Sequence, residues 1–268
     1  MIIVGIDLAW SEKNGTGLCV AEGGRVIDSG FVRSDVEIQS WLSEWAGEPL
    51  VAAVDAPLIM TNDSGSRACE KIVTKWMGGR HAGAHSSNLS QPAFSGGPRA
   101  ERIAKGLECS TDPARGPGSG DRQMIEVYPH PALVALFSLP VTLKYKNKTG
   151  RTIEDRQAEF ERLAECLESL TNAFVPFDVR CKRWRQIVRE LQRATKHVEL
   201  DRLEDEIDAY VCAYVAHLWQ KLGPPEVQVV GDARQGYIVT PVCDSAGRVE
   251  PELSRLQKAR SAVTSSGV

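Results

Sequence analysis

Two runs of apolar, mostly β-branched residues, each followed by an aspartate, constrain the fold most. Residues 2–6 are IIVGI and precede Asp7, and residues 50–54 are LVAAV and precede Asp55. Such runs are typical of strands buried on both faces in the middle of a sheet. Aspartate is depleted in strands and costly to bury without a partner. We therefore expect Asp7 to bind a metal or a basic group or to take part in a reaction; the alternative is that it only caps a turn.

Glycine and turn residues indicate how the chain leaves the first run. Residues 16–22 and 25–31 flank the Gly23-Gly24 step, which is a strong hairpin signal. The chain therefore opens with three antiparallel strands, and the helix that follows returns it to residues 50–54. A strand that contains Glu126 and ends at Pro129 should follow later, and residues 227–242 indicate a second hairpin.

Helical periodicity is clear in several segments between and after these strands. Ser34 and Glu37 form the capping-box pattern at the start of the first helix. The segment 179–196 is strongly basic, which indicates either a phosphate contact or a solvated face. Further helices are predicted over residues 64–77, 153–170 and about 200–222.

Composition limits the class of protein. The chain has 268 residues, 42% of them apolar, and a formal net charge of −3, so no global positive field indicates nucleic acid. Its seven cysteines lack a CxxC pair, which argues against a zinc site and predicts reduced thiols in a cytoplasmic protein. The sequence shows neither a secretory leader nor an apolar run of about 18 residues, so we expect no membrane partner.

The domain organisation predicted is one domain over residues 1–243 and a polar, flexible tail over 244–268. Residues 78–122 are rich in Gly, Ser, Pro and basic residues and show little periodicity. A stretch of this length inside a domain is usually a functional loop, a lid or a flexible insertion. We expect a short helix near residues 98–107 within it and leave the choice between a lid and a solvated insertion open.

Acidic side chains recur at positions that a sheet and a helix can bring together. Asp205 and Asp208 are three residues apart, so they lie about 60° apart on one edge of the last long helix. Carboxylates gathered with Asp7 and Asp55 would repel one another unless a cation neutralises them. Mg²⁺ or Mn²⁺ suits oxygen ligands best, and two such ions could activate water and stabilise a leaving oxygen.

The succession of motifs resembles a known class of nucleases. GIDLAW, a glycine-punctuated hairpin, AVDAPL and a late DEIDAYVCA resemble ribonuclease-H-like nucleases, particularly the Holliday-junction-resolvase branch. With SRACEKI, EVYPHPAL, KYKNKTGR followed by Arg156, and GYIVTP, the chain is similar to a prokaryotic family of predicted ribonuclease-H-fold nucleases described as a domain of unknown function. This resemblance extends to about residue 242.

The resemblance implies a fold and a site. The fold is α/β, a mixed five-stranded sheet in the order 3-2-1-4-5 with strand 2 antiparallel, helices on both faces and a C-terminal hairpin. Asp7, Asp55, Asp205 and Asp208 would be catalytic metal ligands, and Glu126 an additional ligand or a base. Aspartate at position 55 departs from the glutamate of the resolvase pattern. Resolvase relatives dimerise, which suggests a homodimer.

Several other residues have both a functional and a structural interpretation. Arg67 either contacts a phosphate or pairs with Glu70 one turn along its helix. His130 either assists the reaction or lies in a turn beside two prolines. Trp10 either stacks on a base or packs against the core. The sequence predicts a phosphate clamp from three further basic residues, with a solvated loop as the alternative: Lys144, Lys146 and Arg151.

Three functions are compatible with these features. The first is a metal-dependent nuclease whose substrate is DNA, RNA or a smaller phosphoester. The second is an ATP-binding phosphotransferase of the actin-like, sugar-kinase type, but such proteins duplicate the acid-bearing strand and hairpin that occur once here. The third is an inert binding protein that retains the fold. Mn²⁺ titration separates the first from the third.

Overall fold

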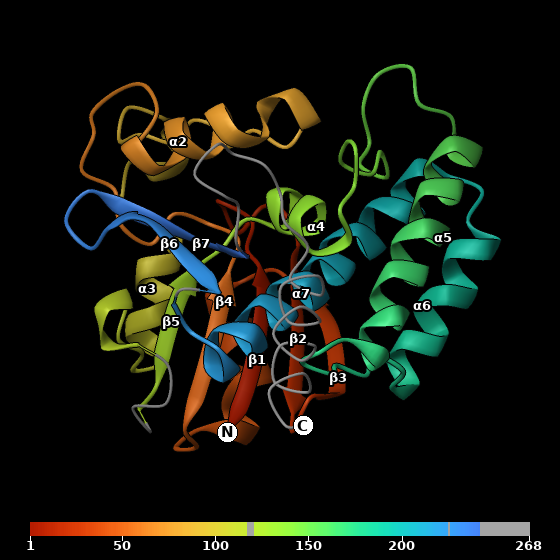
Figure 1. Ribbon diagram of the computed structural model, residues 1–268, viewed down its shortest axis with the longest axis horizontal. Helices are drawn as coiled ribbons and strands as arrows, with labels where there is room; N and C mark the ends of the chain where they lie inside the picture. The colour runs from red at the N-terminus through yellow and green to blue at the C-terminus, as the bar shows by residue number, and fades with distance from the viewer. Residues whose placement is uncertain (117–120, 225, 242–268) are drawn as a thin grey trace, which may run out of the picture.

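A five-stranded mixed sheet forms the centre of the computed structural model, which describes residues 1–116, 121–224 and 226–241 (Figure 1). Its strands are β1 (Ile2–Asp7), β2 (Thr16–Glu22), β3 (Arg25–Val32), β4 (Leu50–Val54) and β5 (Gln123–Glu126). They lie in the order β3-β2-β1-β4-β5. β1 pairs antiparallel with β2 and parallel with β4, which confirms the predicted order and strand directions.

A second, two-stranded sheet closes the described chain. β6 (Val227–Asp232) and β7 (Gly236–Pro241) pair antiparallel, which confirms the predicted C-terminal hairpin. This hairpin packs against α2 (Ala68–Met77), and β7 also contacts β5. The hairpin therefore lies beside β5, with α2 packed against it (Figure 1).

Helices surround the main sheet, and their ends follow local chemistry. In α1 (Asp35–Leu42) the Ser34 hydroxyl accepts from the Glu37 amide at 3.2 Å, and the Glu37 carboxylate accepts from the Ser34 amide at 2.8 Å, so the predicted capping box is confirmed. The helix predicted over 64–77 begins only at Ala68, because Gly65 has a φ of +69° and the N-cap residue, Arg67, is extended with a ψ of 159°. The remaining helices are α3 (Arg99–Gly106), α4 (Pro129–Phe137), α5 (Ile153–Ser169), α6 (Lys182–Arg193) and α7 (His197–Lys221). Within the described residues, none combines the length and apolarity needed to cross a membrane.

The longest helix, α7, lies against β1, β2 and β4. A Cβ built on Gly5 of β1 would come within 1.9 Å of the Ala209 carbonyl oxygen of α7, and one built on Gly17 of β2 within 1.9 Å of the Asp205 carbonyl oxygen. The backbones therefore touch at two places where only glycine fits. This contact brings the acidic edge of α7 to the carboxyl end of β1.

The described part of the predicted 78–122 insertion packs against the domain. It contains α3, at the position expected for a short helix. Arg99 of α3 is 1% exposed, donates to the Ala9 carbonyl at 2.8 Å and to the Arg33 carbonyl at 2.5 Å, and pairs with Asp35 at 2.6 Å. These bonds hold α3 to the loops after β1 and β3. The predicted tail at 244–268 lies outside the described residues.

Gly5→Ala should lower the free energy of unfolding by about 3 kcal/mol or more, because the new methyl group meets helix backbone that cannot rotate away. Urea denaturation followed by circular dichroism measures the change. Gly79→Ala is the matched control, since a Cβ there meets no atom within 4 Å. Equal stability of the two variants would contradict the close packing of α7.

Candidate active site at the carboxyl ends of β1 and β4

Asp7 and Asp55 are neighbours at the carboxyl ends of two parallel central strands. Ile6 is in register with Val54, and the Asp55 amide extends the ladder by donating to the Ile6 carbonyl at 2.8 Å. Equivalent positions on adjacent strands project to the same face. Asp7 and Asp55 therefore share the face of the sheet that Gly5 turns toward α7.

Two more aspartates reach this point from α7. Asp205 is half-buried, and its carbonyl lies over Gly17, the residue paired with Asp7 across the β1–β2 ladder. Asp208 is fully buried, and its Oδ1 accepts a hydrogen bond from the Tyr145 hydroxyl at 2.6 Å. The structure thus brings together the four predicted aspartates, which we call the carboxylate cluster: Asp7, Asp55, Asp205 and Asp208.

Burial and mutual repulsion dominate the electrostatics of this cluster. Burial raises the pKa of Asp7 well above its ordinary value, and the charges of Asp208, Asp55 and Asp205 raise it further. Burial together with neighbouring carboxylates raises the pKa of Asp55 to about 7 and that of Asp205 to about 7. The Lys146 ammonium opposes each of these shifts. The cluster therefore attracts positive charge.

Lys146 supplies such a charge. Its Nζ lies 2.7 Å from Asp208 Oδ2, an ion pair without hydrogen-bond geometry, and 3.8 Å from Glu204 Oε1. Burial works against the charged lysine, but Asp208 and Asp7 raise the pKa of Lys146 well above its ordinary value. The predicted phosphate-clamp lysine is therefore an internal partner of the carboxylates in this structure.

Two arginines fix the backbone on either side of the Lys146 side chain. Arg156 is fully buried, and its Nε donates to the Tyr145 carbonyl at 2.7 Å. Arg151 donates to the Lys146 carbonyl at 2.6 Å. Arg151, which the sequence predicts to be part of a phosphate clamp, thus contacts the backbone of Lys146, another predicted clamp residue.

Glu126 does not join the carboxylate cluster. The β4–β5 register pairs it with Val54 rather than Asp55, so strand alternation directs it to the opposite face. Its two oxygens accept from the Arg67 guanidinium at 2.9 and 2.5 Å, and Oε2 also accepts from the Leu58 amide at 2.9 Å. Glu126 nevertheless lines the same cavity as Asp7 and Asp55, and its charge contributes to the raised pKa of Asp55, so its catalytic role stays a prediction.

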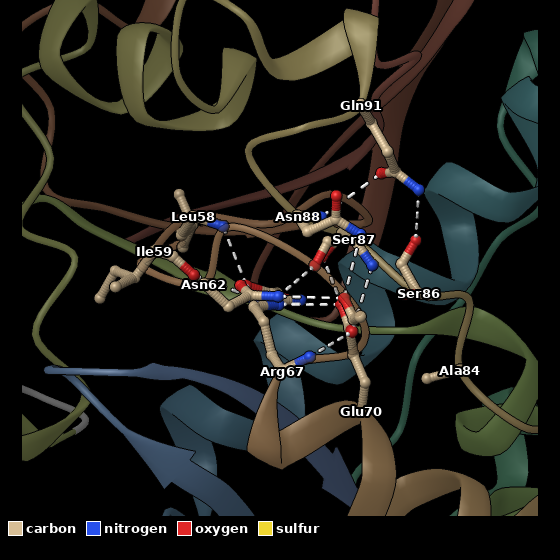
Figure 2. Close-up of polar contacts among 12 residues, drawn as sticks. Leu58, Ile59, Asn62, Arg67, Glu70, Ala84, Ser86, Ser87, Asn88 and Gln91 are labelled. Carbon is tan, nitrogen blue, oxygen red and sulfur yellow. Dashed lines mark hydrogen bonds and ion pairs between the residues drawn. The ribbon is translucent and has the colours of Figure 1, made fainter.

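Arg67 belongs to a buried polar network, which Figure 2 shows around the loop after β4. Its Nε donates to Glu70 at 2.8 Å, and Glu70 in turn accepts from the amide and the hydroxyl of Ser87. Arg67 is 3% exposed, so the Arg67–Glu70 pair exists but is not a surface pair. The network fastens the loop between β4 and α2 to β5 and to Ser87, and the proposed phosphate contact of Arg67 stays untested.

A cavity of about 270 Å³ lies beside the carboxylate cluster. Asp7, Asp55 and Lys146 line it, together with Trp10 and the Arg67 network. Trp10 also packs against Phe94 in a tilted arrangement, with ring centroids 4.8 Å apart, so its packing role is present in the structure. A second hollow shares Asp7 and Ala9 with this cavity. Its lining is mixed in charge, with the basic residues Lys13, Arg33 and Arg202 beside the acidic residues Asp201, Glu204 and Asp205.

The other two predicted site residues lie in different surroundings. His130 lines the cavity, its ring packs 5.9 Å from that of Tyr145, and its Nε2 is buried without a hydrogen-bond partner. Burial and the Lys146 charge lower the pKa of His130 to about 4, so it is neutral at pH 7. Lys144 is exposed, and its amide donates to Glu159 at 2.6 Å.

Sequence reasoning did not identify Tyr145, Gly5 or Gly17 as parts of the site. An aromatic residue between two lysines was the available signal for Tyr145. Glycine inside a strand pattern signals close approach of another backbone, and both glycines had that signal.

Comparison with known proteins places the chain in a family. The model for the family described as "Protein of unknown function (DUF429)" matches residues 5–232, so the chain belongs to that family. No curated protein and no solved structure matches it. The predicted membership of a family of unknown function is confirmed.

Replacing Arg67 by methionine should lower the free energy of unfolding by about 3–5 kcal/mol, because the buried Glu126 carboxylate loses its partner. The double variant Arg67→Met/Glu126→Leu removes the Arg67–Glu126 pair and leaves Glu70 with its hydrogen bonds from Ser87, so it should recover more than half of that loss. Chemical denaturation measures both variants. A double variant no more stable than the single one would show that the pair is not the dominant interaction.

Asp205→Asn should stabilise the metal-free protein more at pH 8 than at pH 5. The Asp205 carboxyl has a pKa of about 7 in the folded protein, against an ordinary value of 3.8, so the folded state binds its proton more tightly than the unfolded state. The free energy of unfolding therefore falls as the pH rises from about 4 to 7 and this carboxyl ionises. We expect a difference of about 2 kcal/mol, allowing for partial exposure. The control is Asp28→Asn, an exposed carboxylate on β3. Equal stabilisation by Asp205→Asn at both pH values would contradict the raised pKa.

Proposed function

We propose that the protein is a divalent-metal-dependent phosphodiesterase that hydrolyses nucleic acid at the carboxylate cluster. The observation that carries this proposal is the meeting of four aspartates from β1, the end of β4 and α7 beside a cavity. Clusters of carboxylates with raised pKa values in a cleft are characteristic of reaction centres, because their cost to stability needs a compensating role.

The carboxylate oxygens of the cluster suit a hard divalent cation. Within the described residues, the carboxylates of Asp7, Asp55 and Asp205 accept no hydrogen bond, so their oxygens have free lone pairs. Oxygen donors of this kind match Mg²⁺ and Mn²⁺. In the same part of the chain, no three His, Cys, Asp or Glu side chains form a ready-made metal site. The aspartates would therefore have to adjust their side chains to hold an ion.

The chain's own residues would divide the work. Asp7, Asp55 and Asp205 would hold the cation, and Tyr145 keeps Asp208 oriented through its hydroxyl. A bound divalent cation would supply the charge that activates water and stabilises a leaving oxygen. The Lys146 ammonium, which also lines the cavity, would attract the phosphate.

The two hollows support a chain-like substrate. They meet at Asp7 and Ala9, so a polymer can occupy both with a phosphate beside the cluster. Lys13, Arg33 and Arg202 suit contacts with further phosphates, although Asp201, Glu204 and Asp205 line the same hollow. The extent of the two joined hollows favours DNA or RNA over a smaller phosphoester. Both hollows belong to one copy of the chain, so a single copy suffices to bind the substrate. The homodimer that the resemblance implies is a separate prediction.

Asp7→Asn and Asp55→Asn should each lower the rate of Mn²⁺-dependent cleavage by at least about 100-fold, because each removes a charge from the reaction centre. The assay follows labelled single- and double-stranded DNA and RNA in Mn²⁺ and in EDTA. Asp28→Asn, which changes an exposed aspartate on β3, is the matched control and should leave the rate unchanged. Undiminished cleavage in both site variants would remove the proposal.

A further inference from the structure

Lys146 occupies one side of the carboxylate cluster. Its side chain is 25% exposed and its Nζ lies 2.7 Å from an oxygen of the fully buried Asp208. Lys148 also lines the cavity but forms no ion pair among the described residues. Of the two lysines, Lys146 is therefore the one whose ammonium group contacts the carboxylate cluster.

The surroundings of Lys146 hold it there. Arg156 binds the Tyr145 carbonyl and Arg151 binds the Lys146 carbonyl, so the backbone is fixed on both sides of the side chain. Arg156 is itself anchored by Asp201 at 2.8 Å and Glu204 at 3.1 Å. A loop fastened by two arginines keeps the lysine at the cluster instead of releasing it to solvent.

This arrangement divides the cluster into two parts. Both oxygens of Asp208 are contacted, Oδ1 by the Tyr145 hydroxyl and Oδ2 by Lys146. The carboxylates of Asp7, Asp55 and Asp205 have no such partner among the described residues. Three carboxylates suffice for one divalent ion, which commonly keeps several of its waters.

We propose that the cluster takes one divalent cation, at Asp7, Asp55 and Asp205, and that Lys146 supplies the second positive charge of the centre. This inference rests on the proposed function and sharpens it, because a site of four aspartates otherwise suits two ions. Lys146 replaces one of them with a charge built into the chain. Asp208 then orients Lys146 and does not ligate the ion.

The test is the number of Mn²⁺ ions bound by the full chain, measured by isothermal titration calorimetry and by the electron paramagnetic resonance signal of free Mn²⁺. We expect one ion per chain in the wild type and in Lys148→Met, and two in Lys146→Met, where Asp208 loses its ammonium partner. Two ions in the wild type, none in the wild type, or one ion in Lys146→Met would each overturn the inference.

A second pair of variants keeps the test valid if Lys146→Met does not fold. Asp208→Asn should leave the affinity for the single ion within about threefold of wild type, whereas Asp7→Asn should weaken it at least about tenfold. Equal losses in the two variants would overturn the inference, because Asp208 would then be a ligand.

Cleavage assayed on the same preparations separates this inference from the proposed function. One bound ion without cleavage of any DNA or RNA would remove the nuclease proposal and keep the inference that the site holds one ion. Two bound ions with cleavage would keep the nuclease proposal and remove the one-ion inference.

Discussion

At Gly5 and Gly17 the backbone of α7 lies directly against β1 and β2, with no side chain between them. This contact sets the distance between the helix that carries Asp205 and Asp208 and the strand that ends at Asp7. A methyl group at either glycine would push the helix outward, because the atoms it meets are backbone. The carboxylate cluster therefore depends on two residues that have no side chain.

The cost of the cluster explains the polar architecture around it. Buried aspartates with raised pKa values oppose folding when they ionise, and Lys146 and Tyr145 offset part of that cost. Arg156 and Arg151 hold the loop that carries both residues. Arg67 and Glu126 form a second buried ion pair, which lines the same cavity and supports the loop after β4. This end of the sheet thus holds aspartates without a hydrogen-bond donor among the described residues and a glutamate that is paired with an arginine.

The sequence predicts the sheet and the four aspartates of the carboxylate cluster, and the physical reasons are local. Apolar runs that end at Asp7 and Asp55 are local patterns, and parallel pairing of their strands makes the two acids neighbours. The part played by Glu126 was not predictable, because strand register decides its face and a shift of one residue reverses it. The position of Lys146 was also hidden. Arg156 and Arg151 fix its loop through hydrogen bonds to backbone carbonyls, and such bonds leave no periodic pattern in the sequence.

We propose that the aspartates at the ends of β1 and β4 and on α7 form a cation-binding reaction centre. A crystal structure of the protein soaked in Mn²⁺, with anomalous difference density collected at the manganese edge, is the sharpest test. We expect one anomalous peak within coordination distance of the Asp7, Asp55 and Asp205 carboxylates, with Lys146 still beside Asp208. No peak among these carboxylates at millimolar Mn²⁺ would contradict it.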